Sequence, residues 1–117
     1  MSKLLIHASH GAEDPERASL PWIFGNKAIL AGQDVAMMLT MEAVRLVTEG
    51  GADGIRHASH PPLAELIKEF VDAGGTVWAC ESCTKPRGIT EVVDGAEIRG
   101  AVTVVEYLAS GAQSLSF

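Results

Sequence analysis

Short aliphatic runs alternate with segments of helical periodicity along almost the whole chain. Residues 4–8, 34–39 and 76–80 are apolar at nearly every position, which predicts strands that are buried on both faces. We expect a weaker strand over 54–57 and a short last strand over 114–117. Buried strands separated by helices are typical of parallel sheets. The pattern therefore predicts a three-layer α/β/α sandwich with a mainly parallel five-stranded sheet.

Capping residues mark where the intervening helices begin. Asp14 and Pro15 form an N-cap and a first-turn proline, and they predict a helix to about residue 31 that Pro21 should kink or restart. Thr40 is expected to cap a helix that extends through Val47. Two further helices are expected, one between Pro62 and Gly74, with apolar residues at 63, 66, 67, 70 and 71, and one over 100–109.

Composition narrows the class of protein. The 117 residues predict a single domain over 1–117, and the net charge is −6 with no basic run, so we expect no binding to nucleic acid or to a membrane surface. No apolar run approaches the roughly 20 residues of a membrane-spanning helix. The first residues do not resemble a signal peptide, so a cytoplasmic location is expected. In that compartment the two cysteines are interpreted as free, reactive or metal-bound thiols.

Candidate chemistry concentrates in three segments, 9–14, 57–61 and 80–87, which contain or adjoin every histidine and cysteine. All three should lie at the carboxyl edge of the sheet, where ligands gather in parallel α/β folds. Cys80 ends a predicted strand, Cys83 follows it, and Arg87 could stabilise a thiolate there. No glycine-rich nucleotide-binding pattern occurs in the chain, so we expect no cofactor.

Taken in order, these segments resemble those of the DsrE/DsrF-like (YchN-like) family of small proteins associated with sulfur relay. The matching residues are Leu4 to Gly11 with Glu13 to Ala18, Pro61-Pro62-Leu63, Cys80-x-x-Cys83-x-x-x-Arg87-Gly88-Ile89, and Gly95-Ala96-Glu97-Ile98-x-Gly100.

The resemblance implies a doubly covered α/β sandwich that assembles as a trimer or as a hexamer of two trimers. It also places the family's functional cysteine on Cys80, which would carry a persulfide between a protein sulfur donor and a protein sulfur acceptor. Arg87 and nearby backbone N–H groups would stabilise the thiolate, and His10 is the candidate proton partner. Apolar residues on more than one face of the last helix also predict a homo-oligomer.

Other interpretations stay open at this point. Cys80 and Cys83 could act as a redox dithiol, in which Cys83 resolves a persulfide on Cys80. The same crevice could belong to a non-catalytic oligomeric module that binds a small anion or nucleotide. A zinc site formed by His10, His60, Cys80 and Cys83 is a further alternative. His7 lies within a predicted strand and is interpreted as a core residue.

Overall fold

The computed structural model describes residues 2–117, which fold around one five-stranded sheet with a radius of gyration of 13.0 Å. The strands are β1 (Lys3–Ala8), β2 (Asp34–Leu39), β3 (Thr76–Cys80), β4 (Ala96–Arg99) and β5 (Gln113–Ser116). The helices are α1 (Pro15–Leu30), α2 (Leu63–Asp72), α3 (Glu81–Thr84) and α4 (Ala101–Ala109), together with the 3₁₀ helices η1 (Met41–Val47) and η2 (Lys85–Arg87).

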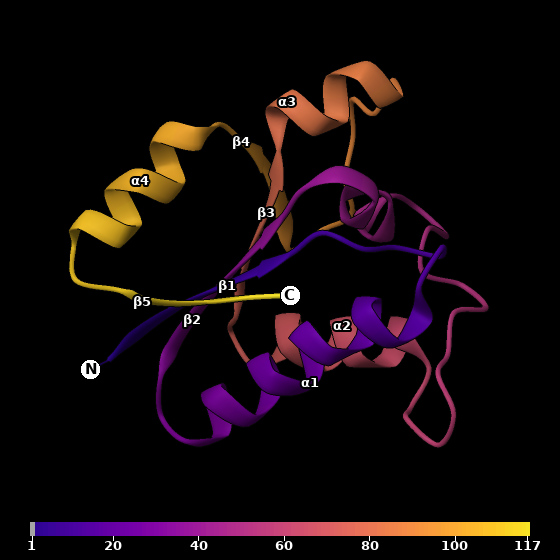
Figure 1. Cartoon of the computed structure of the whole chain (residues 1–117), viewed down its shortest axis with the longest axis horizontal. Coiled ribbons are helices and arrows are strands. Elements are labelled where there is room, and N and C mark those ends of the chain that lie inside the picture. Colours follow the sequence, from indigo (N-terminus) through magenta and orange to yellow (C-terminus); the bar gives the residue numbers. More distant parts are fainter. Residues whose placement is uncertain (1) are drawn as a thin grey trace.

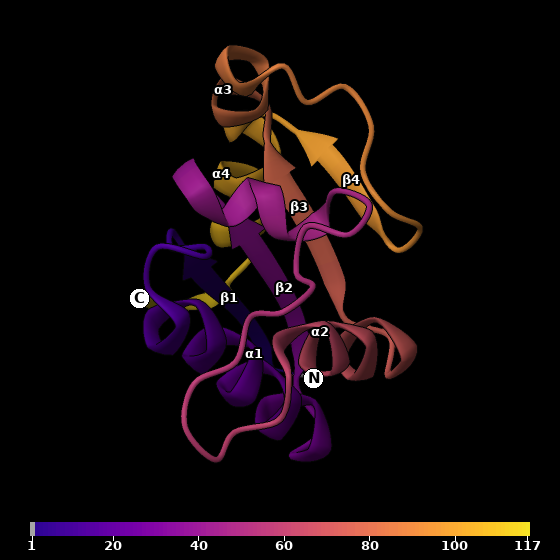
Figure 2. The ribbon, with the colours of Figure 1, turned by 90° about the vertical axis from the view of Figure 1, so that its right-hand side faces the viewer.

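All neighbouring strands are parallel, in the order β4-β3-β2-β1-β5. The chain moves across the sheet from β1 to β4 and then returns to the far side of β1 with β5. Because crossovers between parallel strands are right-handed, this reversal places α4 on the face opposite α1 and α2. Figure 1 shows this division, and Figure 2 shows β3 and β4 side by side with the same direction. The predicted three-layer α/β/α sandwich is confirmed.

The main core lies between the sheet and the α1–α2 layer. The rings of Trp22 and Phe70 meet edge to face, with centroids 5.4 Å apart, beneath strand residues such as Ile6, Met37 and Val77. The α4 layer is much thinner, because one nine-residue helix spans the return from β4 to β5 and none of its residues is buried. The two sides of the sheet are therefore covered very unequally.

Local signals account for the best predicted helices. Asp14 accepts a hydrogen bond from the Arg17 backbone N–H at 3.1 Å, which satisfies one free donor at the start of α1. Pro21 does not end α1, which is one helix to Leu30; its fully buried ring packs in the core and offsets the lost backbone hydrogen bond. The apolar stripe of α2 is buried as predicted.

Three predicted features differ in the structure. The segment after Thr40 is the 3₁₀ helix η1, and the Thr40 side chain does not cap it because the hydroxyl contacts His7 instead. Residues 54–57 form no strand, since Gly54 at φ 77° and Ala58 at φ 48° turn the chain on either side. The fifth strand is β4, at the sheet edge beside β3.

Among the residues that the structure describes, no helix has both the length and the apolar character needed to cross a membrane.

Candidate functional site

Cys80 occupies the position that the sequence predicts, at the carboxyl end of β3 and immediately before α3. The residue is 8% exposed, and its Sγ lies 3.2 Å from the Ser82 Oγ. Burial raises the pKa of the Cys80 thiol, but hydrogen bonds from the side chains and backbone N–H groups of Ser82 and Cys83 outweigh it and leave the pKa below its ordinary value. Hydrogen bonds from Ser82 and Cys83 therefore favour the thiolate form of Cys80.

A cavity of about 370 Å³ has Cys80 among its lining residues. It lies between α4 and the sheet, and we call it the α4 pocket. Its walls come from four strands, one helix and the residue after β2: Leu5, His7, Met38, Thr40, Cys80, Ala101, Val104, Val105, Leu108, Ser114 and Ser116. The pocket exists because α4 alone cannot cover the sheet between β1 and β3. This volume falls near the lower end of the roughly 300–1,000 Å³ that small-molecule pockets occupy.

His7 and Thr40 form the principal polar contact in the α4 pocket. The His7 Nε2 lies 2.6 Å from the Thr40 Oγ1, and burial lowers the pKa of His7 below its ordinary value. In the sheet register, Ala8, Leu39 and Ala79 lie side by side. Thr40, directly after β2, and Cys80, the last residue of β3, therefore lie next to each other on the face that carries His7. The interpretation of His7 as a core residue missed its position in the α4 pocket beside Thr40. The alternation Leu5-x-His7 on one strand face was the signal that could have found it.

His10 does not join the cysteine in this pocket. Its Nδ1 lies 2.9 Å from the Glu13 Oε2, and the other Glu13 oxygen accepts a hydrogen bond from the Gly11 N–H at 2.6 Å. Gly11 also passes close to the Glu42 carbonyl, so an added Cβ would lie 2.7 Å from that oxygen. His10 is therefore part of the loop that follows β1, and its contacts indicate a structural role there.

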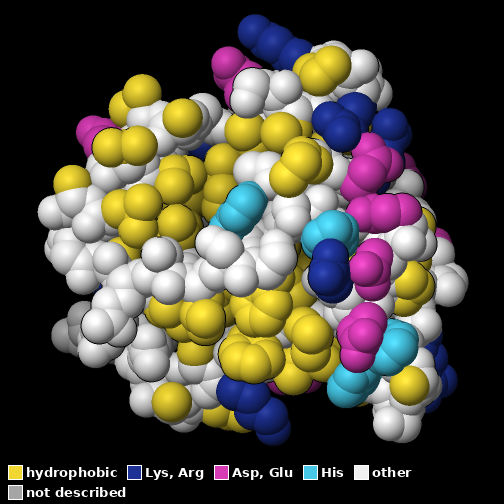
Figure 3. Space-filling view, viewed as in Figure 1, with side chains coloured by type: hydrophobic (Ala, Val, Ile, Leu, Met, Phe, Trp, Pro, Cys, Tyr) yellow, Lys and Arg dark blue, Asp and Glu magenta, His cyan; other side chains and the backbone are white. Residues whose placement is uncertain are grey.

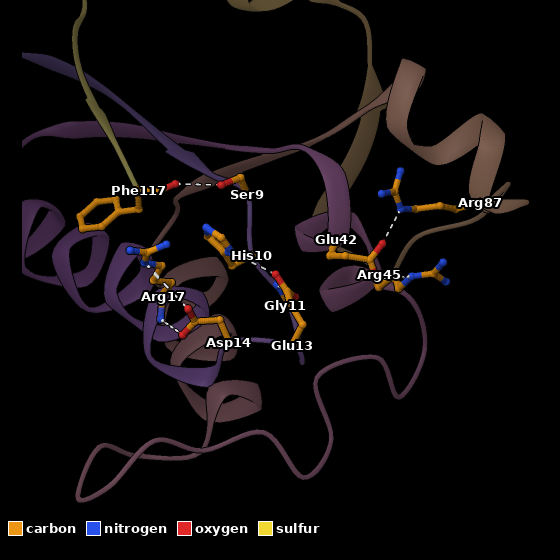
Figure 4. A network of polar contacts seen from close by, with 10 residues as sticks. All are labelled: Ser9, His10, Gly11, Glu13, Asp14, Arg17, Glu42, Arg45, Arg87 and Phe117. Carbon is orange, nitrogen blue, oxygen red and sulfur yellow. Dashed lines mark hydrogen bonds and ion pairs between the residues drawn. The ribbon is translucent and has the colours of Figure 1, made fainter.

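Arg87 likewise makes its contacts away from the Cys80 sulfur. Its Nε donates to the Glu42 Oε2 at 2.8 Å, and one terminal nitrogen donates to the Cys83 carbonyl at 3.1 Å. Glu42 also accepts from the Arg45 Nε at 2.9 Å. Arg87 therefore fastens the segment that carries Cys83 to η1, which makes it a positioning residue. We call the residues in this set of ionic contacts the charged network, drawn in Figure 4: His10, Glu13, Asp14, Arg17, Glu42, Arg45 and Arg87.

Cys83 is half-buried and contacts two hydrophobic clusters, the main core and the smaller cluster that contains Cys80. Its thiol and N–H contribute to the lowered pKa of Cys80, so the two sulfurs are close enough to influence each other. Both cysteines are free.

Among the described residues, 2–117, no three His, Cys, Asp or Glu side chains converge on one point, so the structure does not bring His10, His60, Cys80 and Cys83 together. His60 lies beside His57, with ring centroids 5.9 Å apart, while His10 pairs with Glu13. The two histidines of the predicted site therefore have partners other than the cysteines.

A second hollow, of about 300 Å³, lies on the α2 side between that helix and residues 46–53. It is lined by Asp53, Lys68, Asp72 and Asp94 among apolar residues, and Lys68 is already paired with Asp72 at 2.6 Å. Its lining includes no cysteine or histidine, so the α4 pocket is the better candidate for thiol chemistry.

Solved structures share this fold over the full chain. The YchN protein of E. coli superposes with a TM-score of 0.81 at 21% identity, covering 100% of both chains. Protein MTH1491 of Methanobacterium thermoautotrophicum superposes with a TM-score of 0.74 at 14% identity, again covering 100% of both. At these identities the likeness establishes the fold.

Sequence relatives extend the comparison. The uncharacterized protein MJ0760 of Methanocaldococcus jannaschii is 27% identical over 110 residues, which are 92% of this chain and 40% of MJ0760. The chain thus spans less than half the length of that relative. The uncharacterized protein MK0008 of Methanopyrus kandleri is 31% identical over 85 residues, covering 71% of this chain and 67% of MK0008. The pattern of the DsrE/DsrF-like family matches residues 2–117, so the chain belongs to this sulfur-relay-related family.

Proposed function

We propose that the protein is a sulfur carrier that holds a persulfide on Cys80. The single observation that carries this proposal is Cys80 itself, which lines a cavity and whose thiol has a lowered pKa because of hydrogen bonds from Ser82 and Cys83. Membership of a sulfur-relay-related family supports it.

The loading step needs only a thiolate and a donor with a sulfane sulfur. The Cys80 thiolate attacks the outer sulfur of a donor R–S–SH, and a new S–S bond forms as the S–S bond of the donor breaks. The products are Cys80–S–SH and RS⁻, so the electron pair of the broken bond leaves with the donor. Delivery is the reverse reaction, in which an acceptor thiolate attacks the outer sulfur of the Cys80 persulfide.

The surroundings of Cys80 suit a bound persulfide. An exposed persulfide meets competing thiols in solution, whereas the 8% exposure of Cys80 restricts attack to groups that fit the α4 pocket. Loading and delivery then depend on what can enter the pocket. We place this activity in the cytoplasm, where thiols stay reduced, with protein donors and acceptors that dock at the pocket mouth.

The test is to incubate the protein with a persulfide donor and weigh it intact. We expect a gain of one sulfur atom that is lost on reduction, retained in Cys83→Ser and absent in Cys80→Ser. Cys83→Ser is the matched control because it removes the same atom three residues away. A Cys80→Ser protein that still gains sulfur would refute the carrier role.

Cys83 gives the dithiol alternative a specific basis, because its thiol contributes to the lowered pKa of Cys80. The Cys83 thiolate can attack the inner sulfur of the Cys80 persulfide, forming a Cys80–Cys83 disulfide and expelling HS⁻. If this step operates, the persulfide lasts longer in Cys83→Ser than in the unchanged protein, and sulfide release falls. Equal lifetimes would leave Cys83 a packing residue.

We also propose that the chain assembles as a homo-oligomer, a trimer or hexamer, through the α4 side. Val102 is 70% exposed and Val105 61% exposed on α4, and Leu115 on β5 is 38% exposed. Hydrophobic side chains spread over this part of the surface in Figure 3. A second copy of the same largely apolar surface suits such a patch better than a charged partner. Light scattering should give a trimer or hexamer mass that Val102→Asp lowers; a monomer at micromolar concentration would refute the assembly.

A further inference from the structure

The α4 pocket is uncharged although the protein as a whole is not. The chain has 24 charged side chains counted as Lys, Arg, Asp and Glu, and none of them is among the pocket-lining residues. On the face drawn in Figure 3, acidic and basic side chains are most concentrated along the edge opposite α4, where two of the histidines in view also lie. The lining is aliphatic, with small hydroxyls from Thr40, Ser114 and Ser116.

The histidine in the pocket does not supply a charge either. His7 is partly buried, its Nε2 is engaged by Thr40 at 2.6 Å, and burial lowers its pKa, which favours the neutral imidazole at pH 7. The Arg87 guanidinium, which could have attracted an anion, is held by Glu42 and the Cys83 carbonyl. An anion that reached Cys80 would therefore lose its hydration without gaining a cation.

We infer, on the basis of the proposed carrier function, that the α4 pocket accepts sulfur donors whose reacting end is small, uncharged and partly apolar, and that it excludes anionic donors such as thiosulfate. The polar end of such a donor has the Thr40 and Ser116 hydroxyls as hydrogen-bond partners, and its apolar part lies against Val104 and Leu5.

The same property selects the reactive form of the donor. A hydropersulfide exists as neutral R–S–SH and as the anion R–S–S⁻, and only the neutral form presents an outer sulfur that a thiolate attacks readily. A largely apolar lining that contains no cation disfavours the anion relative to water. The transfer then runs as Cys80–S⁻ plus R–S–SH to Cys80–S–SH plus RS⁻, and RS⁻ takes its proton from water once it leaves.

The first test uses two alkylating reagents of similar size, neutral iodoacetamide and anionic iodoacetate. The rate of each reaction at Cys80 and at Cys83 is measured by peptide mass mapping, and Cys83 corrects for intrinsic reactivity and for the net charge of the protein. We expect the iodoacetamide-to-iodoacetate ratio at Cys80 to exceed that at Cys83 by about tenfold or more, because the pocket penalises a buried charge. Equal ratios would overturn the inference, as would a Cys80 that reacts with neither reagent.

A charge-introducing pair of variants sharpens the test. Ser116 faces the pocket in register with His7, whereas Gln113, on the same exposed strand, is not among the pocket-lining residues. Ser116→Lys should raise the rate at which iodoacetate alkylates Cys80 several-fold. Gln113→Lys makes the same change of net charge and should leave that rate unchanged. Equal effects of the two lysines would show that long-range charge governs access, which contradicts selection by the pocket.

Sulfur donors complete the experiment and separate the two proposals. The hydropersulfides of N-acetylcysteine amide and of N-acetylcysteine differ in one carboxylate, and we expect faster loading of Cys80 from the amide, with little loading from thiosulfate. Preferential loading from thiosulfate would overturn the pocket inference while leaving the carrier function intact. If no donor loads Cys80 but the alkylation contrast holds, the carrier function fails and the preference for neutral ligands stands.

Discussion

The charged network lies in the segments beyond the carboxyl edge of the sheet, and the α4 pocket lies on the α4 face and reaches that edge at Cys80; the two regions are built in opposite ways. In the network, ionic side chains pair with one another, as Glu42 does with Arg45 and Arg87, and most of them stay substantially exposed. In the pocket, the polar groups are neutral and border an apolar cavity that reaches Cys80. The network holds loops in place, whereas the pocket presents a reactive atom.

The difference also sets how much each region depends on its neighbours. Exposed ion pairs contribute little to stability because water and salt compete with them. A polar or charged group that is placed among buried apolar side chains loses its water without such a replacement. Substitutions in the pocket should therefore have larger effects than formally similar substitutions in the network, and four predictions test this from the largest effect to the smallest.

Met38→Lys should have the largest effect. Met38 is 5% exposed on the floor of the pocket, so an ammonium there is buried without a partner, and we expect the free energy of unfolding to fall by about 3–5 kcal/mol. Met41→Lys is the control, because Met41 is 50% exposed at the start of η1. Urea unfolding gives the free energy of unfolding of both variants. Similar losses in the two variants would contradict the expected difference between pocket and surface.

Thr40→Val should have an intermediate effect. The change keeps the shape of the side chain but removes the hydroxyl that contacts His7, and we expect a loss of about 1 kcal/mol in unfolding free energy. Thr48→Val removes an exposed hydroxyl that donates to the Arg45 carbonyl, which water can replace, so the loss should be smaller. A larger loss in Thr48→Val would contradict the prediction.

The pH dependence of stability should separate the regions as well. Burial depresses the pKa of His7 in the folded protein below its ordinary value of 6.5, so the unfolded state binds more protons as the pH falls below that value. The contribution of His7 to the free energy of unfolding is thus fully present above pH 6.5, and it declines as the pH drops toward the pKa of the folded state. His7→Gln should flatten this part of the profile of unfolding free energy against pH, and an unchanged slope would count against it.

Glu42→Gln should have the smallest effect on stability. The hydrogen bond from Arg87, followed by that from Arg45, lowers the pKa of Glu42 below its ordinary 4.5, so its contribution is present above pH 4.5 and is lost as the pH falls through the folded value. At pH 7 we expect the free energy of unfolding to fall by less than in Thr40→Val. The loss should become smaller still in high salt. Chemical unfolding at two salt concentrations checks this; a loss that resists salt would place Glu42 with the pocket residues.

The sequence predicted the strands that are buried on both faces, because continuous apolar runs leave few alternatives. It missed β4, where Glu97 and Arg99 are charged and pair with each other at 2.6 Å. An edge strand tolerates such residues, so its pattern is weak. It wrongly predicted a strand at 54–57, where apolar Ile55 instead accepts a hydrogen bond from the Leu63 N–H through its carbonyl.

The candidate site was predicted in part for a related reason. The position of Cys80 follows from the end of one strand, which local pattern determines. The pairing of His7 with Thr40 depends on the register between two strands, and the pairing of Arg87 with Glu42 joins segments 45 residues apart. Contacts of that kind are set by tertiary packing, which motif spacing does not encode.

The thin cover that α4 provides has a dynamic consequence. No residue of α4 is buried, and the helix packs on the sheet through half-buried Val104 and Tyr107, whose hydroxyl donates to the Asp34 carbonyl at 3.1 Å and whose ring meets Trp78. Amide hydrogens of such a helix exchange with solvent through local opening, well before the central strands unfold. In a single copy of the chain, access to the sulfur would then follow the fluctuation of this one helix and be nearly independent of global stability.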